Sequence, residues 1–165
     1  DAMPLAQRVL FAQAILRSIG LLRGFGRLLV LCGHESTTEN NPYQASLDCG
    51  ACGGQGGGPN ARTAAVILNQ PEVRAELRRT GIDLPADTYV VAVVHDTATD
   101  RVTVCDTHLL PAGHRRDIDR LTGDLAHAGR ALAAERCTML PGATRRRSPA
   151  AAARHVAPAY GLVKD

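Results

Sequence analysis

The chain has 165 residues, of which 45% are hydrophobic and 21% are charged, and it carries a formal net charge of +3 at pH 7. This length suits one domain with its own core, and the hydrophobic content excludes an intrinsically disordered chain. The weak, scattered positive charge and the aromatic content of 3% argue against nucleic-acid binding, and no apolar run reaches the ~20 residues that span a bilayer.

Helical spacing of apolar residues predicts a first helix over 4–23, and the continuous apolar run that follows predicts a buried strand over 27–32. The next segment, 33–58, is longer than an ordinary connection, so functional residues are expected in it. A proline suits the first turn of the helix predicted over 59–69. The same kind of pattern predicts a further helix over 71–81, which a glycine ends.

β-Branched residues predict strands over 88–95 and 101–105, and the short polar turn between them predicts a hairpin. The last predicted element is a helix over 115–137. Together these elements predict an α/β fold with three layers and a small mixed sheet. In this prediction 1–140 form one domain and 141–165 form an irregular tail.

The chain contains five cysteines, an odd number, and no segment with the pattern of a signal peptide. Free or metal-bound thiols in a reducing compartment are therefore expected, rather than a framework of disulfides. Because the first residue is Asp1 rather than Met, we treat the sequence as part of a longer protein.

The segment after the first strand carries His34, Cys49 and Cys52, which resemble half of a zinc site. His34 is expected just beyond the carboxyl end of the strand, where α/β sheets bind ligands, and the two cysteines have CxxC spacing. A structural zinc site takes four protein ligands and a catalytic site takes three, so the set is complete only if both cysteines bind. The alternatives are an ordinary histidine at a strand end and a pair of redox or buried cysteines.

Glycines in the same segment allow the backbone to approach another group closely, at positions 50, 53, 54, 56, 57 and 58. Their spacing matches neither GxGxxG nor a phosphate-binding P-loop, which argues against a nucleotide site. An anion bound at the N-terminus of the helix over 59–69, without any metal, is a third possibility.

Two weaker patterns in the sequence suggest other catalytic sites. The sequence at His34 begins an HExxH motif, but position 38 is Thr38, so the metalloprotease pattern fails. His95, Asp96 and Asp100 lie around the predicted hairpin, where they either line a crevice or only form the turn.

The remaining cysteines and an arginine run are expected to have structural or surface roles. Cys32 is expected to be a packed small hydrophobe, and Cys105 and Cys137 have no metal-ligand spacing with any other residue. The arginines at 145–147 are expected to form a solvated surface, or to meet an acidic lipid surface or partner.

The stretch GHESTTENNPYQASLDCGACGGQGGGPNAR, at 33–62, resembles the DabA family of bacterial inorganic carbon transporter subunits. The resemblance continues through ILNQPEVRAEL at 67–77 and GIDLPADTYVVAVVHDTATDRV at 81–102, and so covers most of the chain. Proteins of this family are several times longer and resemble β-type carbonic anhydrases. The resemblance therefore implies that 1–140 is the C-terminal half of a larger β-carbonic-anhydrase-like domain.

The resemblance also implies a zinc site that is formed by two cysteines, one histidine and one aspartate. His34 and Cys49 match two of these ligands, while the other Cys and the Asp would lie in an upstream CxD segment that this chain lacks. Under this interpretation Cys52, Asp48 and Asn41 surround the metal without binding it.

The family implies an activity, in which zinc lowers the pKa of a bound water toward ~7 and the resulting hydroxide converts carbon dioxide to bicarbonate. His34 and Cys49 would then be catalytic, and activity would need the longer protein. The resemblance further implies a membrane-embedded, proton-conducting partner subunit (DabB-like) and a peripheral position on the cytoplasmic face of the inner membrane. The alternative is a non-catalytic structural zinc or redox module that uses Cys52 as well.

Overall fold

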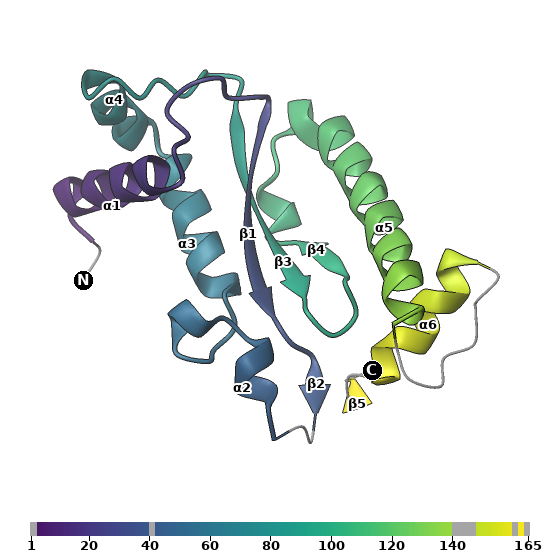
Figure 1. Ribbon diagram of the computed structural model, residues 1–165. Coiled ribbons are helices and arrows are strands. Elements are labelled where there is room, and N and C mark those ends of the chain that lie inside the picture. Colours follow the sequence, from purple (N-terminus) through teal and green to yellow (C-terminus); the bar gives the residue numbers. More distant parts are fainter. Residues whose placement is uncertain (1–2, 40–41, 140–147, 160–161, 164–165) are drawn as a thin grey trace.

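The computed structural model describes residues 3–39, 42–139, 148–159 and 162–163. Its helices and strands form an α/β fold around a small mixed sheet, which confirms the fold class expected from the sequence (Figure 1). No helix in these ranges combines the length and the apolar character that crossing a membrane requires. The helices are α1 (Leu5–Ser18), α2 (Gln44–Leu47), α3 (Gly58–Leu68), α4 (Pro71–Arg79), α5 (Arg115–Cys137) and α6 (Pro149–Ala159).

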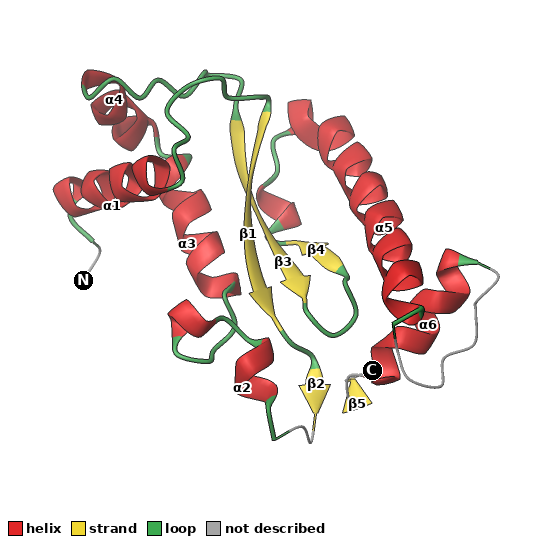
Figure 2. Ribbon diagram, viewed as in Figure 1, coloured by secondary structure: helices red, strands yellow, loops and turns green. Residues whose placement is uncertain are grey.

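The sheet has three strands in the order β1 (Leu28–Glu35), β3 (Tyr89–Asp96) and β4 (Val102–Val104) (Figure 2). β1 and β3 are parallel, whereas β3 and β4 form the predicted antiparallel hairpin. In the described part of the chain, β1 therefore lies at an edge of the sheet. A separate antiparallel pair is formed by β2 (Thr38–Glu39) and β5 (Leu162–Val163).

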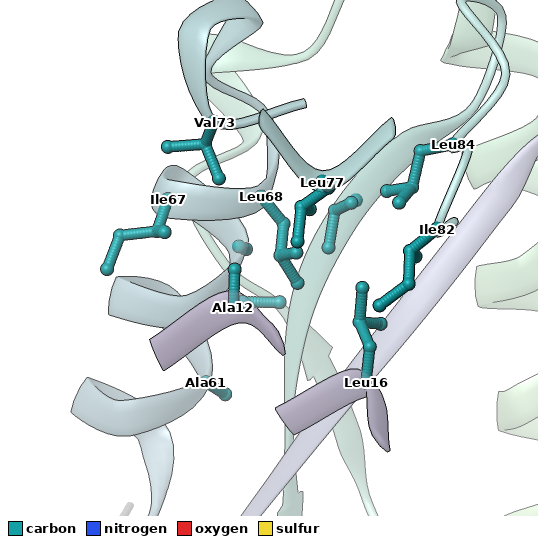
Figure 3. Packing of buried hydrophobic residues seen from close by; sticks show 12 residues of the cluster. Ala12, Leu16, Ala61, Ile67, Leu68, Val73, Leu77, Ile82 and Leu84 are labelled. Atoms are coloured by element: carbon teal, nitrogen blue, oxygen red, sulfur yellow. The ribbon is translucent and has the colours of Figure 1, made fainter. Parts of the chain in front are cut away.

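The main hydrophobic core lies between the sheet and the helices α1, α3 and α4 (Figure 3). Leu16 of α1, Leu68 of α3 and Leu77 of α4 are completely buried there, and Val90 and Ala92 of β3 face them. Val91 and Val93 are buried as well, and they point to the opposite face because side chains alternate along a strand. Helix α5 lies on that other side and contacts β4 (Figure 1).

Three segments differ from the sequence-based expectation. The helix predicted over 4–23 already ends at Ser18, because Gly20 turns the chain with a left-handed φ of 71°. The strand predicted over 27–32 continues to Glu35, because every residue of β1 from Leu28 onward finds a parallel partner in β3. Within 141–165, where an irregular tail was expected, α6 is a helix, since the alanine-rich sequence after Pro149 has a high helix propensity. Residues 140–147, which include the arginines at 145–147, lie outside the described part, and the division into two domains stays a prediction.

Asn69 fixes the end of α3 to the sheet by acting as a substitute for a neighbouring strand. Its side-chain amide donates to the carbonyl of Val90 (2.7 Å), and its carbonyl accepts from the N–H of Val90 (3.0 Å). Arg74 of α4 donates to the same Asn69 carbonyl (2.9 Å) and to the carbonyls of Leu68 and Thr88. Since Val90 is only 1% exposed, its backbone groups have no easy access to water.

Replacing Asn69 with Ala should therefore lower the free energy of unfolding by about 1–3 kcal/mol, because two buried backbone groups lose their partner. Urea denaturation measures this change. Gln7→Ala, on the exposed surface of α1, is the control and should change the stability by less than about 0.5 kcal/mol. Equal stabilities of the two variants would contradict this role of Asn69.

Candidate metal centre

His34 lies near the carboxyl end of β1, within the strand rather than beyond it as predicted. Its backbone carbonyl accepts a hydrogen bond of 2.7 Å from the N–H of Gly57, and its register partner in β3 is His95. The His34 side chain is exposed. The extended strand therefore still presents His34 at the end of the sheet where ligands bind in α/β folds.

The glycines after β1 allow the loop to pack directly against the strand. A Cβ atom on Gly33 would lie only 2.6 Å from the carbonyl carbon and oxygen of Gly57, and one on Gly57 would lie 3.0 Å from the N atom of His34. A Cβ on Gly56 would lie 2.8 Å from a carboxylate oxygen of Glu35. Gly33 and Gly57 thus let the loop backbone pack directly against the backbone of β1, while Gly56 leaves room for the Glu35 side chain. This contact sets where α3 begins.

Cys49 comes directly before a short 3-10 turn (Gly50–Cys52) and Cys52 ends it, and their sulfur atoms are 2.7 Å apart. Asn60, in the first turn of α3, donates a hydrogen bond of 3.2 Å to the Cys52 sulfur. The neighbouring Cys49 thiol, and partial burial to a smaller extent, raise the pKa of Cys52 above its ordinary value. The Cys52 sulfur therefore has two neighbours, the Cys49 sulfur and the Asn60 amide.

One cavity of about 480 Å³ brings together all three residues that the sequence singled out, His34, Cys49 and Cys52. It opens beside β1, the edge strand. The Cys32 thiol and the Asn60 amide line the same cavity. No sequence pattern points to Asn60, although its position in the first turn after Pro59 places it beside the loop. Apolar side chains and glycine backbone line the rest of the cavity: Ile15, Ile19, Val30, Leu31, Gly33, Gly57, Ala61 and Ala64.

The shared cavity does not amount to a complete metal site. Among the described residues, no group of three His, Cys, Asp or Glu side chains is arranged so that it could hold a metal ion. Asp48 accepts a hydrogen bond of 2.8 Å from the N–H of Ser36, so it ties the loop to the end of β1. Asn41 lies outside the described residues. The ligand assignments of His34 and Cys49, and the roles of Cys52 and Asp48 around the metal, stay predictions.

His95 and Asp100, the weaker candidates near the hairpin, are joined to each other and to α5. The Nε2 atom of His95 lies 3.1 Å from a carboxylate oxygen of Asp100, and Arg136 of α5 donates to the other oxygen. Asp100 is buried and adopts a left-handed conformation with φ of 57°. These residues therefore shape the turn and fix it to α5. No local sequence pattern identifies Arg136 as their partner.

Two of the other cysteines can be compared with expectation. Cys32 was expected to be packed inside, but it is exposed, because β1 is an edge strand in the described chain. Cys137 is buried against Ala133 and Ala152, as expected for a structural residue.

Comparisons with known proteins agree on one family. The sequence model of the family described as "Probable inorganic carbon transporter subunit DabA" matches residues 1–160. Proteins with that name from Chloroflexus aurantiacus and from Roseiflexus sp. (strain RS-1) are each 50% identical over 138 residues, which is 84% of this chain. A protein named "Probable inorganic carbon transporter subunit DabA 1" from Bradyrhizobium sp. (strain ORS 278) is 50% identical over 135 residues, or 82% of this chain.

The chain spans 16% of the length of each of these three relatives. No solved structure matches the chain at a significant level.

The contact between Gly33 and Gly57 generates a prediction about stability. Gly33→Ala should lower the free energy of unfolding by about 2 kcal/mol, because its Cβ would overlap the backbone of Gly57. Gly50→Ala is a matched control from the same loop, where an added Cβ meets nothing within 4 Å. Urea denaturation of both variants tests the prediction, and it is wrong if Gly50→Ala destabilises as much as Gly33→Ala.

Asp96, at the end of β3, makes the free energy of unfolding depend on pH through its hydrogen bonds to the segment that follows β1. Burial alone would raise the pKa of Asp96, but hydrogen bonds from Thr99, Thr37 and the N–H of Ala98 outweigh it and hold the pKa below its ordinary value. The stabilisation is therefore fully present above the ordinary pKa of about 3.9 and is lost as the pH falls through the lower folded value. We expect the unfolding free energy of Asp96→Asn to fall less than that of the unmodified chain between pH 6 and pH 3; parallel profiles would contradict this.

Proposed function

The chain belongs to the DabA family, and from this premise we propose that it forms part of the zinc site of an inorganic carbon transporter subunit, where carbon dioxide is hydrated to bicarbonate. The observation that carries the proposal is that His34 and Cys49 line the same cavity although they come from a strand and a distant part of the loop. The name that these relatives carry supports inorganic carbon transport as the process.

The donor atoms fit zinc, since an imidazole nitrogen and a thiolate sulfur are among its usual ligands. His34 and Cys49 would hold the ion together with a Cys and an Asp from the upstream CxD segment of the longer protein. Two features support a shared site: β1 has an edge without a partner strand in the described chain, and the cavity opens beside it. In this proposal Cys52 lies beside the metal without binding it, with its sulfur next to that of Cys49 and held by the Asn60 amide.

When bound, zinc supplies Lewis acidity that lowers the pKa of a coordinated water. The residues of this chain would contribute binding and orientation. Val30, Leu31 and Ala64 give the cavity an apolar wall, which suits carbon dioxide because the molecule has no net charge or dipole. Asn60 holds the Cys52 thiol by its amide hydrogen bond, and Asp48 holds the loop against the end of β1.

Transport would require more than this chain. We place it in a peripheral subunit on the cytoplasmic face of the inner membrane, beside a membrane-embedded, proton-conducting partner (DabB-like). The word "subunit" in the names of the relatives supports the existence of a partner.

A local dithiol module is the second candidate function, because the sulfurs of Cys49 and Cys52 are adjacent. In this alternative the two cysteines act together, either as ligands of a structural zinc with His34 or as a redox pair. The amides at the start of α3 support a metal-free anion site less well, since the N–H of Gly57 already donates to His34.

Substitution in a full-length relative separates the first two candidates. We expect the variants equivalent to His34→Ala and Cys49→Ser to lose most of their bound zinc and most of their carbon dioxide hydration activity, because each substitution removes a direct ligand. Cys52→Ser is the matched control, three residues away, and should keep most of the zinc. Zinc per chain is measured by elemental analysis. Equal loss of zinc in Cys49→Ser and Cys52→Ser would contradict the carbonic-anhydrase-like assignment and favour the local dithiol module.

A further inference from the structure

A second cavity, of about 460 Å³, lies between the β3–β4 turn, α5 and α6, and shares no lining residue with the cavity of His34. Figure 1 shows the turn beside the ends of these two helices, on the far side of the sheet from α3. Three arginines line the cavity, one from each element: Arg101, Arg130 and Arg154. No part of the proposed carbon dioxide site explains why three positive charges meet here.

The charge of this arginine cavity is uncompensated within the described residues. Arg101, Arg130 and Arg154 are exposed and form no ion pair there, whereas Arg27, Arg62, Arg78 and others each pair with a carboxylate.

Asp100, the acidic residue of the lining, does not neutralise these arginines. Its side chain is only 3% exposed, and its two oxygens already bind His95 and Arg136. The accessible wall of the cavity is therefore strongly positive, with the Thr122 hydroxyl beside it.

Packing fixes the three elements that carry the arginines. A Cβ on Gly129 would lie 2.6 Å from the carbonyl oxygen of Asp100, so this glycine lets α5 pack directly against the turn. Ala152 of α6 is completely buried against Ala133 and Cys137 of α5. Arg130 is next to Gly129, and Arg154 lies two residues beyond Ala152. The positions of the arginine backbones are thus set by buried contacts.

We propose that the arginine cavity binds a phosphate group. Guanidinium groups match the oxygen geometry of phosphate and can bind it with paired hydrogen bonds. Three uncompensated positive charges favour a doubly charged oxyanion over a singly charged one such as bicarbonate.

The phosphate can belong to a soluble molecule or to a lipid headgroup, so the test has two arms. The first is calorimetric titration of this chain with inorganic phosphate and with pyrophosphate. The second is co-sedimentation with vesicles of phosphatidylglycerol, compared with vesicles of phosphatidylcholine. Binding in the first arm indicates a soluble phosphate, and binding only to phosphatidylglycerol vesicles indicates a lipid phosphate; both outcomes support the proposal.

Charge-removing variants decide whether the binding is local. Arg101→Gln and Arg130→Gln should each weaken binding about tenfold, since each removes a charged hydrogen-bond donor. Arg116→Gln is the matched control, because it removes the same charge from the same exposed helix, about 21 Å along the axis from Arg130. It should bind like the unmodified chain. All three side chains are exposed, and far-UV circular dichroism checks that the variants remain folded.

Two results would overturn the proposal. One is that neither phosphate nor phosphatidylglycerol vesicles bind. The other is that Arg116→Gln weakens binding as much as Arg130→Gln, which would assign the binding to net charge rather than to the arginine cavity.

Discussion

The close contact between β1 and the glycine loop is the constraint on which the rest of the structure depends. The N–H of Gly57 binds the carbonyl of His34, and Gly33 leaves room for the Gly57 backbone. This contact starts α3 at Gly58, so that Leu68 reaches the core under the sheet. The same contact closes the loop back onto the strand and brings Cys49 into the cavity of His34. Fold and candidate site thus share one physical origin.

The sheet separates two regions with different chemistry. On one side, α1, α3 and α4 form an apolar core, and the cavity of His34, Cys49 and Cys52 has mostly apolar walls. On the other side, α5 and α6 meet the β3–β4 turn around the buried Asp100 and a cavity lined by arginines. An uncharged gas suits the first environment and an oxyanion suits the second. The two cavities therefore differ in the chemistry of their walls, and the two proposals rest on this difference.

Local patterns in the sequence predict most of the elements but few of the distant contacts. The proline in the first turn of α3, the valine-rich strand β3 and the bounds of α5 are all confirmed, because propensity and periodicity determine them. The extension of β1 through His34 was missed, since it depends on pairing with β3 rather than on β propensity. The ion pair of Asp100 with Arg136 was missed for the same reason: its partners are far apart in the sequence. The CxxC spacing pointed to two cysteines that share a cavity with His34, but it could not identify Asn60, because that contact depends on where α3 begins.

Zinc bound per chain tests the central claim most directly, when this chain is compared with a version extended upstream through the next CxD segment of the longer protein. Each is measured by elemental analysis after the same purification, with the same protein carrying His34→Ala as the reference. The shared-site account predicts about one zinc in the extended version, dependent on His34, and little in the chain alone. A full zinc bound by the chain alone would contradict it, because the ligands would then all be local.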